Sequence, residues 1–350
     1  MPNKYLFELF DMNKVAVVIL NWNGAKMLQK YLPSVIKNTN EELADIIIAD
    51  NGSTDNSLDV LKKEFPGIRT IQLDKNYGFA EGYNKALAQC EHPYFVLLNS
   101  DVEVTPRWLE PIIKNLDKNP AIAAAQPKIK AWANKDMFEY AGASGGYLDQ
   151  YGYPFCRGRI INEVETDNGQ YDDPATVLWA TGACLFIKSD VYKAMGGLDG
   201  TFFAHMEEID LCWRIKNRGY EIMTYPESTV YHLGGGTLPN NSPRKLFLNY
   251  RNNLLLLYKN LPEKSLNKTM RMRFLLDLLS AALYVLQLKP NFALQVFKAR
   301  KAYRKLKPSY KTIRNELQSK RKTNYHPEIL NGSILWNFFV RGKKRFSQVK

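Results

Sequence analysis

Residues 96–106 read VLLNSDVEVTP, and this stretch decides what kind of fold the chain can adopt. Its first three residues are apolar and indicate a strand that is buried on both faces of a sheet. The run then ends on Asn99, Ser100 and Asp101, with Glu103 close behind. Asp and Asn favour turns, so a surface turn is one explanation. The other is that the strand carries a metal-binding carboxylate, Asp101, to the edge of a sheet.

The sequence on both sides of this stretch alternates apolar runs with segments whose apolar residues recur at helical spacing. The apolar runs are VAVVILN (15–21), DIIIADN (45–51), IRTIQLD (68–74) and YFVLLNS (94–100). Strands separated by helices of this length predict an α/β fold. We expect a Rossmann-like, doubly wound, mostly parallel sheet with helices on both faces.

Polar residues stand where these predicted strands end. In such sheets the ligand binds beyond the carboxyl ends of the strands, which meet at one edge. Turn preference would explain any single polar residue there, but four of them at four strand ends indicate a ligand site. The four residues are Asn21, Asp50, Asp74 and Asp101.

The first loop after a strand, NWNG (21–24), excludes two common classes of nucleotide-binding protein. It lacks the GxGxxG fingerprint of dinucleotide-binding folds, and no GxxxxGK[ST] phosphate loop occurs in the chain. Carboxylates and amides at strand ends suit a base, a ribose and a metal ion instead. Asp50 can accept hydrogen bonds from a ribose hydroxyl or a pyrimidine N–H, and Gly52 and Ser53 would let the backbone come close.

The loop DKNYGFAEGYN (74–84) has two glycines that flank an aromatic residue, Gly78 and Gly82. We expect it either to close over a ligand or to be the glycine-rich start of a helix. The sequence alone leaves both interpretations open.

Two further groups of residues could carry chemistry. Glu207, Glu208 and Asp210 begin an amphipathic segment, where acids are favoured by the helix dipole. One of them could also be a general base that removes a proton from an acceptor hydroxyl. His232 ends a predicted strand before a glycine-rich loop, and it is either structural or a metal ligand.

Composition limits the broad class of the protein. With 45% hydrophobic and 24% charged residues, the chain is an ordinary globular protein rather than a disordered one. Its four cysteines form no CxxC pair, which fits a reducing compartment and argues against a structural zinc site. No signal-peptide pattern opens the sequence, so we expect a cytoplasmic location.

Basic residues are concentrated at the carboxyl-terminal end of the chain. Residues 298–350 hold 16 Lys and Arg against Glu316 and Glu328, so they account for +14 of the formal net charge of +13 and the rest of the chain carries −1. The preceding apolar run, FLLDLLSAALYVLQL (274–288), is 15 residues long and contains Asp277, which is too short to cross a bilayer comfortably. An apolar helix beside dense positive charge is typical of a helix that lies on an anionic membrane surface, on its cytoplasmic face. A helix packed on the catalytic domain is the alternative.

The ordered set of motifs resembles family 2 glycosyltransferases, and within them the rhamnosyltransferase-like enzymes. The resemblance covers about two thirds of the chain, and its motifs are VVILNWNG, ADNGSTDNS, NYGFAEGYNKAL, LLNSDVEVTPRWLE, TGACLFIKSDVYKAMGGLDGTFFAHMEEIDLCWR and VYHLGGGT. It implies a GT-A fold over residues 1–240, with a nucleotide-sugar half at about 14–130 and an acceptor half at 131–240. Residues 241–350 would then be a helical, basic extension.

The resemblance also implies roles for individual residues. Asn99, Ser100 and Asp101 occupy the DxD position, with Asp101 and His232 as ligands of Mg²⁺ or Mn²⁺. The catalytic acids fall on Glu207 and Glu208, with Asp210 as a competitor; we expect Glu208 to be the base. The nucleotide-sugar contacts would be Asn21, Asn23, Asp50, Gly52, Ser53, Asn76, Gly78, Gly82, Asn84, Asn99, Ser100 and Asp101. The acceptor contacts would be Gly182, Trp213 and Arg214.

The expected function is the inverting transfer of one sugar from a UDP- or dTDP-sugar to a hydroxyl of a glycan or lipid-linked acceptor, in cell-surface polysaccharide synthesis. The QxxRW motif of processive relatives is absent, which favours single transfers. A sugar-phosphate nucleotidyltransferase is the enzymatic alternative, although NWNG is not the glycine-rich loop of those enzymes. A nucleic-acid-binding protein is a remote alternative, because no recognised nucleic-acid-binding motif accompanies the basic tail.

Overall fold

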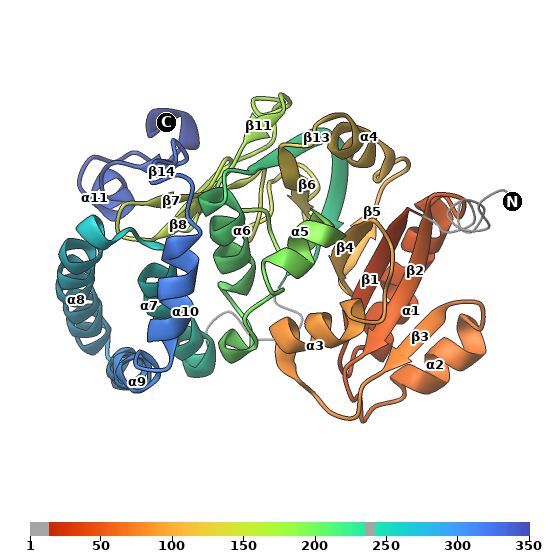
Figure 1. The fold of residues 1–350 in the computed structure, drawn as a ribbon, viewed down its shortest axis with the longest axis horizontal. Helices are drawn as coiled ribbons and strands as arrows, with labels where there is room; N and C mark the ends of the chain where they lie inside the picture. Colours follow the sequence, from red (N-terminus) through yellow and green to blue (C-terminus); the bar gives the residue numbers. More distant parts are fainter. Residues whose placement is uncertain (1–13, 235–241) are drawn as a thin grey trace, which may run out of the picture.

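A computed structural model describes residues 14–234 and 242–350 of the chain. In this part of the chain the largest sheet has nine strands in the order β11-β13-β6-β12-β4-β1-β2-β3, with β5 paired to β13. Helices cover both faces of the sheet, and a group of further helices lies at one end (Figure 1). The α/β fold with a carboxyl-terminal helical region, as expected from the sequence, is confirmed.

The elements follow the alternation of the sequence. The strands of the large sheet are β1 (Val15–Asn21), β2 (Ala44–Asp50), β3 (Arg69–Gln72), β4 (Tyr94–Asn99), β5 (Val102–Val104), β6 (Ile122–Ala131), β11 (Ala175–Thr176), β12 (Cys184–Lys188) and β13 (Glu221–His232). The helices among them are α1 (Ala25–Asn38), α2 (Ser57–Glu64), α3 (Gly78–Leu87), α4 (Glu110–Lys118), α5 (Ser189–Ala194) and α6 (Glu207–Asn217).

Side chains of the strands alternate between two cores. Val15, Val17 and Ile19 of β1 pack in one apolar cluster with residues of α1 and α4. Ala16 and Val18 face the other cluster, which includes residues of α3, α5 and α6. Because successive side chains of a strand point to opposite faces, an apolar run such as β1 is stable only in a sheet that is covered on both sides.

The sheet is mixed rather than uniformly parallel. Strands β3, β2, β1 and β4 are parallel, as expected. Strand β12 lies between β4 and β6 and is antiparallel to both. The segment between β6 and β12 leaves the sheet and returns to it at the same edge, so β12 must run back in the opposite direction. That segment therefore lies at the edge where the parallel strands end.

The segment between β6 and β12 forms a smaller five-stranded sheet with a strand from the end of the chain. Its strands are β7 (Gly146–Asp149), β8 (Pro154–Cys156), β9 (Arg159–Ile160), β10 (Glu163–Val164) and β14 (Ile329–Leu330). Strand β14 pairs with β7, and the backbone N–H of Ile334 donates a 2.9 Å hydrogen bond to the Asp149 carboxylate. The carboxyl-terminal region is thus packed against the rest of the molecule.

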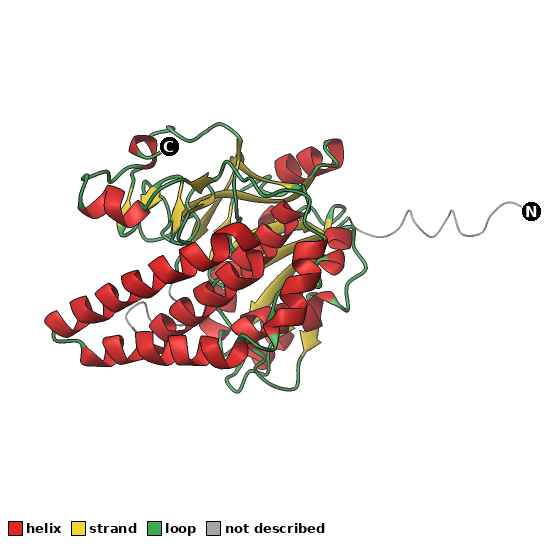
Figure 2. Ribbon diagram, turned by 60° about the vertical axis from the view of Figure 1, so that its left-hand side comes forward, coloured by secondary structure: helices red, strands yellow, loops and turns green. Residues whose placement is uncertain are grey.

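The carboxyl-terminal helices are α7 (Pro243–Asn260), α8 (Glu263–Leu286), α9 (Pro290–Leu306), α10 (Tyr310–Ser319) and α11 (Ile334–Phe339). In Figure 2 the two long helices α8 and α9 reach out beyond the rest of the molecule. The expected domain boundary at 240/241 and the end of the VYHLGGGT motif fall within 235–241, outside the described residues. None of the helices in the described parts of the chain combines the length and apolar character needed to cross a bilayer.

Candidate active site

The ends of β1 and β2 meet in a buried polar cluster. The side-chain amide of Asn21 donates hydrogen bonds to Asp50 Oδ1 (3.1 Å) and Ser53 Oγ (3.2 Å). The backbone N–H of Ser53 donates to the other oxygen of Asp50 at 3.0 Å. Asn21 and Asp50 are almost fully buried, and Asn21 Oδ1 has no hydrogen-bond partner. An unsatisfied buried acceptor at a strand end indicates a place where a ligand donor binds.

The side chain of Asn23 joins two loops rather than pointing to open space. Its Oδ1 accepts hydrogen bonds from the backbone N–H groups of Thr54 (2.7 Å) and Asp55 (3.2 Å). Asn23 has a φ of 51°, a left-handed conformation that Asn adopts more readily than most residues. The structure thus gives Asn23 a positioning role beside Asp50 and Ser53.

The loop 74–78 is held by amide side chains. Asn76 Oδ1 accepts hydrogen bonds from Asn51 Nδ2 (3.2 Å) and from the backbone N–H of Gly78 (2.7 Å). Gly78 has a φ of +76°, and a Cβ there would lie 2.5 Å from the Phe203 ring. Gly52 has a φ of +69°, and a Cβ there would lie 2.5 Å from the backbone of Lys75. These glycines are required because the loops around the strand ends contact each other directly.

Gly82 and Asn84 lie deeper in α3. A Cβ at Gly82 would meet Asn51 Nδ2 at 3.0 Å and the Leu20 side chain at 3.1 Å. Asn84 Oδ1 accepts hydrogen bonds from the Tyr192 hydroxyl (2.7 Å) and the Leu198 N–H (3.0 Å). Asn84 therefore anchors the segment that follows α5, and its carbonyl oxygen is already engaged within the protein.

The stretch Asn99–Asp101 meets His232 across the sheet. Strand β13 pairs with β5 so that His232 lies opposite Val102, the residue after Asp101. His232 Nε2 is 3.1 Å from Asp101 Oδ1 and 3.4 Å from Asn99 Nδ2. Burial would raise the pKa of Asp101, but the interaction with His232 holds it below its usual value. The 131 residues that separate the pair in sequence are bridged only by tertiary structure.

Glu139 completes this group, and sequence analysis did not identify it. Its carboxylate lies 3.5 Å from His232 Nδ1, and all three side chains are mostly buried. Burial would lower the pKa of His232, but the carboxylates of Glu139 and Asp101 raise it to about 10. Glu139 lies in an irregular segment without a motif, so only the fold could place it beside His232.

Asp101 and His232 could each supply one ligand to a divalent cation, provided that His232 gives up the proton that its raised pKa favours. A metal-bound histidine usually directs its second ring nitrogen to a carboxylate, which is the relation between His232 and Glu139. His232 Nδ1 lies 3.5 Å from Glu139 Oε1, and Nε2 lies 3.1 Å from Asp101 Oδ1. Among the described residues there is no group of three or more His, Cys, Asp or Glu side chains that could hold a metal. Asp101 and His232 would leave the remaining positions to other oxygens, as Mg²⁺ sites commonly do.

Glu103 does not join this group. Its two carboxylate oxygens accept hydrogen bonds from Trp132 Nε1 (2.8 Å) and Lys135 Nζ (2.6 Å). The apolar residues on either side of Glu103 are buried, and the acid faces the segment after β6.

Glu207 and Glu208 begin α6 at the same edge of the sheet. Each has one buried carboxylate oxygen without a hydrogen-bond partner. Burial, and then the charge of Glu208, raise the pKa of Glu207 well above its usual value. Burial also raises the pKa of Glu208, to about 7, although backbone N–H groups at the start of the helix oppose the shift. The two acids therefore differ from ordinary surface glutamates, because both bind a proton more firmly.

Gly182 keeps space open beside Glu208. A Cβ at this position would lie 3.2 Å from the Phe79 ring and 3.8 Å from Glu208 Cβ. Gly182 also lies just before β12, where the chain re-enters the sheet at the ligand edge. The structure thus brings Gly182, Phe79 and Glu208 together.

The loop before Glu207 has an unusual backbone. Phe203, His205 and Met206 all have positive φ, at 65°, 70° and 75°. Such conformations are costly for residues with side chains and persist only where surrounding contacts enforce them. Asn252 of α7 supplies these contacts, because its Nδ2 lies within 3.0 Å of the carbonyl oxygens of residues 202, 204 and 205. Sequence analysis missed Asn252; the polar run YRNN (250–253) in a leucine-rich helix was the available signal.

The structure places Asp210, Trp213 and Arg214 in the interior. Asp210 is fully buried and accepts hydrogen bonds from Arg214 Nε (2.8 Å), Lys259 Nζ (2.7 Å) and an amide of α7. Arg214 also donates to the carbonyl oxygens of residues 195 and 197. The expected base candidate Asp210 and acceptor contact Arg214 are therefore bound to other protein groups. Trp213 is 2% exposed, so it offers no surface to an acceptor.

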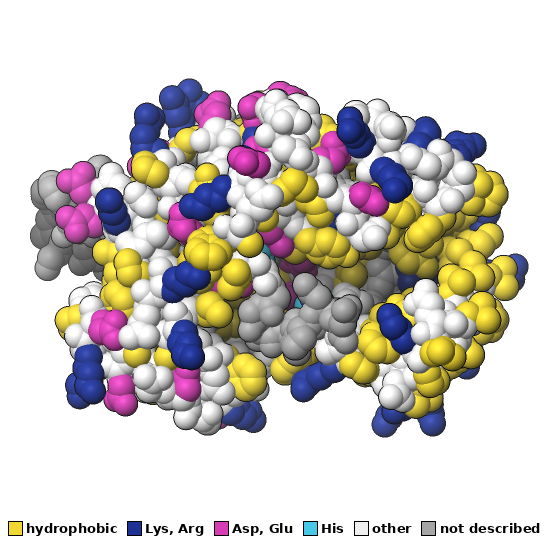
Figure 3. Space-filling view, turned by 180° about the vertical axis from the view of Figure 1, so that it is seen from behind, with side chains coloured by type: hydrophobic (Ala, Val, Ile, Leu, Met, Phe, Trp, Pro, Cys, Tyr) yellow, Lys and Arg dark blue, Asp and Glu magenta, His cyan; other side chains and the backbone are white. Residues whose placement is uncertain are grey.

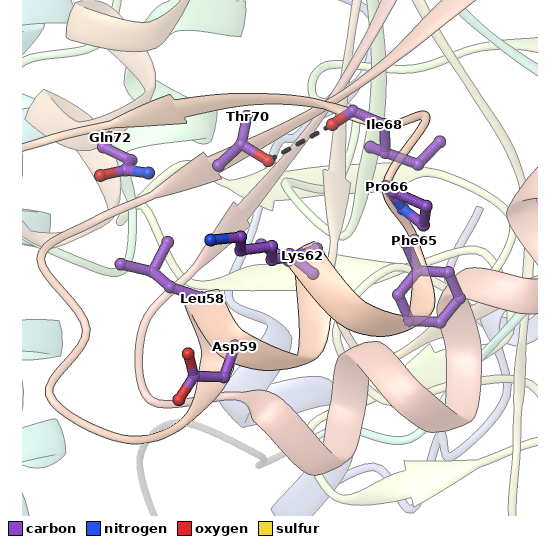
Figure 4. A pocket seen from close by; sticks show the side chains of 9 residues that line it. Leu58, Asp59, Lys62, Phe65, Pro66, Ile68, Thr70 and Gln72 are labelled. Atoms are coloured by element: carbon purple, nitrogen blue, oxygen red, sulfur yellow. Dashed lines mark hydrogen bonds between the residues drawn. The ribbon is translucent and has the colours of Figure 1, made fainter.

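The back of the molecule has a hollow (Figure 3). Seen from behind, the molecule is hollowed near its centre, where acidic side chains and a histidine are visible (Figure 3). A separate pocket lies between α2 and the edge strand β3, lined mainly by apolar residues with Lys62 and Asp59 (Figure 4). None of the candidate residues lines that pocket.

Comparison with known proteins identifies the fold and the family. Residues 16–173, which include β1 to β10, match Glycosyl transferase family 2. These residues form a family 2 glycosyltransferase domain. The resemblance inferred from the motifs is confirmed.

A relative of this glycosyltransferase is the N-acetylglucosaminyl-diphospho-decaprenol L-rhamnosyltransferase of Mycobacterium tuberculosis. The two are 24% identical over 234 residues, which cover 62% of this chain and 75% of that protein.

Two solved structures share the fold. GalNAc-T7 with UDP, GalNAc and Mn²⁺ matches with a TM-score of 0.56 and 18% identity, over 71% of this chain and 48% of that one. A mannosyltransferase of Pyrobaculum calidifontis in complex with GDP-Man and Mn²⁺ matches with a TM-score of 0.51 and 12% identity, over 84% of this chain and 88% of that one. The glycosyltransferase therefore has a GT-A fold, and this chain spans about half the length of the GalNAc-T7 chain.

Proposed function

We propose that this protein transfers one sugar, with inversion, from a UDP- or dTDP-sugar to a hydroxyl of a glycan or lipid-linked acceptor during synthesis of a cell-surface polysaccharide. The observation that carries the proposal is the position of Glu208. It is a carboxylate with a raised pKa and a free oxygen, beside Gly182, at the edge where Asp50 and Asp101 also lie.

The donor nucleotide would bind at the ends of β1 and β2. Asp50 can accept a hydrogen bond from the N–H of uracil or thymine or from a ribose hydroxyl, and the free oxygen of Asn21 can accept another. The contacts with Ser53 fix the orientation of both groups before a ligand arrives. A preorganised site of this kind spends little binding energy on ordering its own side chains.

Asp101 and His232 would hold Mg²⁺ or Mn²⁺, which when bound supplies positive charge to the departing diphosphate. Glu139 would orient His232 through the second ring nitrogen. Asn99 stands where many relatives of this family carry the first Asp of DxD. Its neutral amide lies 3.4 Å from His232 Nε2 and adds no charge to the site.

Glu208 would remove the proton from the acceptor hydroxyl as that oxygen attacks the anomeric carbon. The new bond to the sugar forms as the bond to the diphosphate breaks, on opposite sides of the anomeric carbon, so configuration is inverted. A base with a pKa near 7 is suited to this task, because it is ionised at neutral pH and still binds a proton firmly.

The test begins with nucleotide binding. We expect UDP or dTDP, added with Mn²⁺, to raise the melting temperature of the protein, and we expect GDP to have a smaller effect. A ligand at 100 times its dissociation constant should stabilise the protein by about 2.7 kcal/mol. EDTA or Asp101→Asn should remove the metal-dependent part of the shift. A folded protein that no nucleotide stabilises would contradict the donor site.

The transfer itself is tested with the donor that binds. The anomeric configuration of the product, determined by NMR, should be opposite to that of the donor sugar. Retention would contradict the role of Glu208 as base. Formation of pyrophosphate from a nucleoside triphosphate and a sugar phosphate would identify a nucleotidyltransferase instead.

A further inference from the structure

The hairpin of α8 and α9 exposes a large apolar surface at its turn. Leu275, Leu279, Leu283 and Leu286 recur at helical spacing in the second half of α8 and are 57%, 57%, 47% and 78% exposed. Leu288, in the turn, is 90% exposed. Other exposed apolar side chains on these helices are Phe274, Leu278, Val285, Leu294 and Phe297. We call these ten residues the apolar tip. Isolated exposed leucines are ordinary, but a contiguous group of this size marks an interaction site.

The one acidic residue within the apolar run does not interrupt this surface. Asp277 is fully buried and forms ion pairs with Arg273 (3.3 Å) and Arg300. Its charge is thus directed to the inner side of the hairpin and neutralised there. The outer side of α8 carries no charge from residue 272 to its end. The short length of the apolar run 274–288 and the presence of Asp277 argued against a membrane-spanning segment. Both are compatible with a helix that lies in a membrane interface.

A belt of positive charge lies behind the apolar tip. Its exposed residues are Lys264, Lys268 and Arg271 on α8, and Lys298, Lys301, Arg304 and Lys305 on α9. We call these seven residues the basic belt. Between residues 264 and 315 the sequence has 13 Lys and Arg, and Asp277 is the one acid. The positive charge therefore decreases along the hairpin, from seven exposed basic residues near the body of the protein to one, Lys289, at the turn.

The apolar tip and the candidate active site share one face of the molecule. In Figure 3 hydrophobic side chains gather on the right-hand side, where α8 and α9 lie, and the hollow with acidic side chains opens toward the same viewer. The hairpin is also joined to the site through α7. Arg273 of α8 donates a 2.5 Å hydrogen bond to Asn253, the neighbour of Asn252 that holds the loop before Glu207.

We propose that the apolar tip inserts into the interface of an anionic lipid bilayer, with the basic belt against the headgroups, and that the protein thereby binds the membrane peripherally with its active site facing the bilayer. Apolar side chains enter the boundary between headgroups and acyl chains, and Lys and Arg interact with anionic lipids. The two regions of the hairpin match these two layers in order. A sugar acceptor attached to a lipid would then meet the site without leaving the membrane.

The charge pattern favours this partner over two others. Nucleic acid would bind the basic belt, but seven of the ten residues of the apolar tip are leucines, which do not stack on bases as aromatic side chains do. A second copy of the chain could cover the apolar tip, but facing basic belts would repel each other. A membrane accommodates both features at once.

The first experiment measures binding of the full-length protein to vesicles by co-sedimentation. Vesicles of phosphatidylcholine with 30% phosphatidylglycerol are compared with vesicles of phosphatidylcholine alone, at low and high salt. We expect binding to the anionic vesicles that weakens with salt. Leu275→Glu/Leu279→Glu/Leu283→Glu should reduce the partition coefficient at least about tenfold. Ile36→Glu on α1, an exposed apolar residue far from the hairpin in sequence, is the matched control and should leave binding unchanged.

A second pair of variants tests the basic belt. Lys298→Gln/Lys301→Gln should weaken binding by about fivefold for each charge removed at low salt, and Lys62→Gln/Lys63→Gln on α2 should have little effect. Because both pairs change net charge equally, a general loss of positive charge would weaken binding in both.

A fluorescent label at the turn of the hairpin reports whether the apolar tip enters the bilayer. The four native cysteines are all buried, so Leu288→Cys can be labelled selectively with an environment-sensitive dye. We expect a blue shift on addition of anionic vesicles, and none for the same dye at Lys62→Cys. Circular dichroism and melting curves show that the variants are folded.

The proposal is overturned if the folded wild-type protein does not bind anionic vesicles, or if the glutamate variants bind as well as the control. It is also overturned if the apolar tip forms a dimer interface, seen by light scattering and abolished by the same glutamates. RNA binding that exceeds vesicle binding would favour nucleic acid. None of these measurements needs transferase activity, so failure here and failure of the proposed function are distinguishable.

Discussion

Replacement of Asn252 by alanine tests whether the carboxyl-terminal helices hold the loop that carries the catalytic acids. Asn252 is fully buried, and its Nδ2 lies 3.0, 2.9 and 2.8 Å from the carbonyl oxygens of Phe202, Ala204 and His205. An amide nitrogen has two hydrogens, so the three carbonyl groups share two donors. The alanine variant removes both.

The expected loss of stability follows from these contacts. Each buried hydrogen bond contributes about 1 kcal/mol net, so the variant should lose about 2 kcal/mol of unfolding free energy. For a chain of 350 residues, the melting temperature should fall by about 3 °C. Asn252→Asp should be worse than alanine, because a carboxylate would face three carbonyl oxygens without a donor.

The effect on activity should exceed the effect on stability. Phe203, His205 and Met206 have positive φ, and the loop can relax toward ordinary conformations once Asn252 no longer binds it. That movement would displace Glu208, so we expect kcat to fall at least about tenfold. The KM for the donor should change little, because Asp50 lies on β2, away from this loop.

The assay combines urea unfolding with steady-state kinetics on the same preparations. Asn115→Ala on α4 is the matched control, because its side-chain amide donates one 2.7 Å hydrogen bond to the Pro111 carbonyl far from the site. The control should lose about 1 kcal/mol and no activity. The reasoning is refuted if Asn252→Ala keeps the kcat of the control, or if Asn252→Asp is as stable as wild type.

Four further predictions concern the site itself. Glu208→Gln should lower kcat by about 10²–10⁴ with little change in nucleotide binding measured by calorimetry. In the wild type kcat/KM should rise with pH up to about 7 and then level, because the base must be ionised; a profile without that rise would exclude Glu208 as base. Asp101→Asn should abolish the Mn²⁺-dependent increase in nucleotide affinity, and unchanged metal dependence would place the cation elsewhere. Gly182→Ala should raise the KM for the acceptor severalfold by crowding Phe79, whereas Gly67→Ala, which has no atom within 4 Å of the added Cβ, should be neutral.

The sequence predicted the regular part of the fold because hydrophobic periodicity and strand-end polarity are local signals. The apolar run of β1 can be stable only in a sheet that is covered on both faces. Asp50 is the last residue of the next apolar run, β2. The antiparallel direction of β12 was not predictable in this way, since it depends on the segment between β6 and β12 returning to the same edge. The pattern of residues 184–188 is the same for either direction.

The residues of the candidate site were likewise predictable only in part. The motifs brought attention to Asp101, His232 and Glu208, each in a recognisable local context. They also suggested Asp210 and Arg214, whose polar atoms are in fact bound to each other and to α7. The sequence of a helix that carries acidic and basic residues is the same whether those side chains face a ligand or another helix. The burial of Asp210 and Arg214 and their hydrogen-bond partners therefore had to come from the structure.

The sequence by itself determined the α/β architecture, the edge of the sheet where a ligand site is expected, and the concentration of positive charge near the end of the chain. Only the tertiary structure decided that Glu139 lies behind His232, that Asn252 holds the loop before Glu207, and that Asp277 is turned away from the apolar tip. The physical reason is that periodicity and turn preference act between neighbours in the chain. Hydrogen bonds and charge pairs between distant segments exist only once the fold has brought them together.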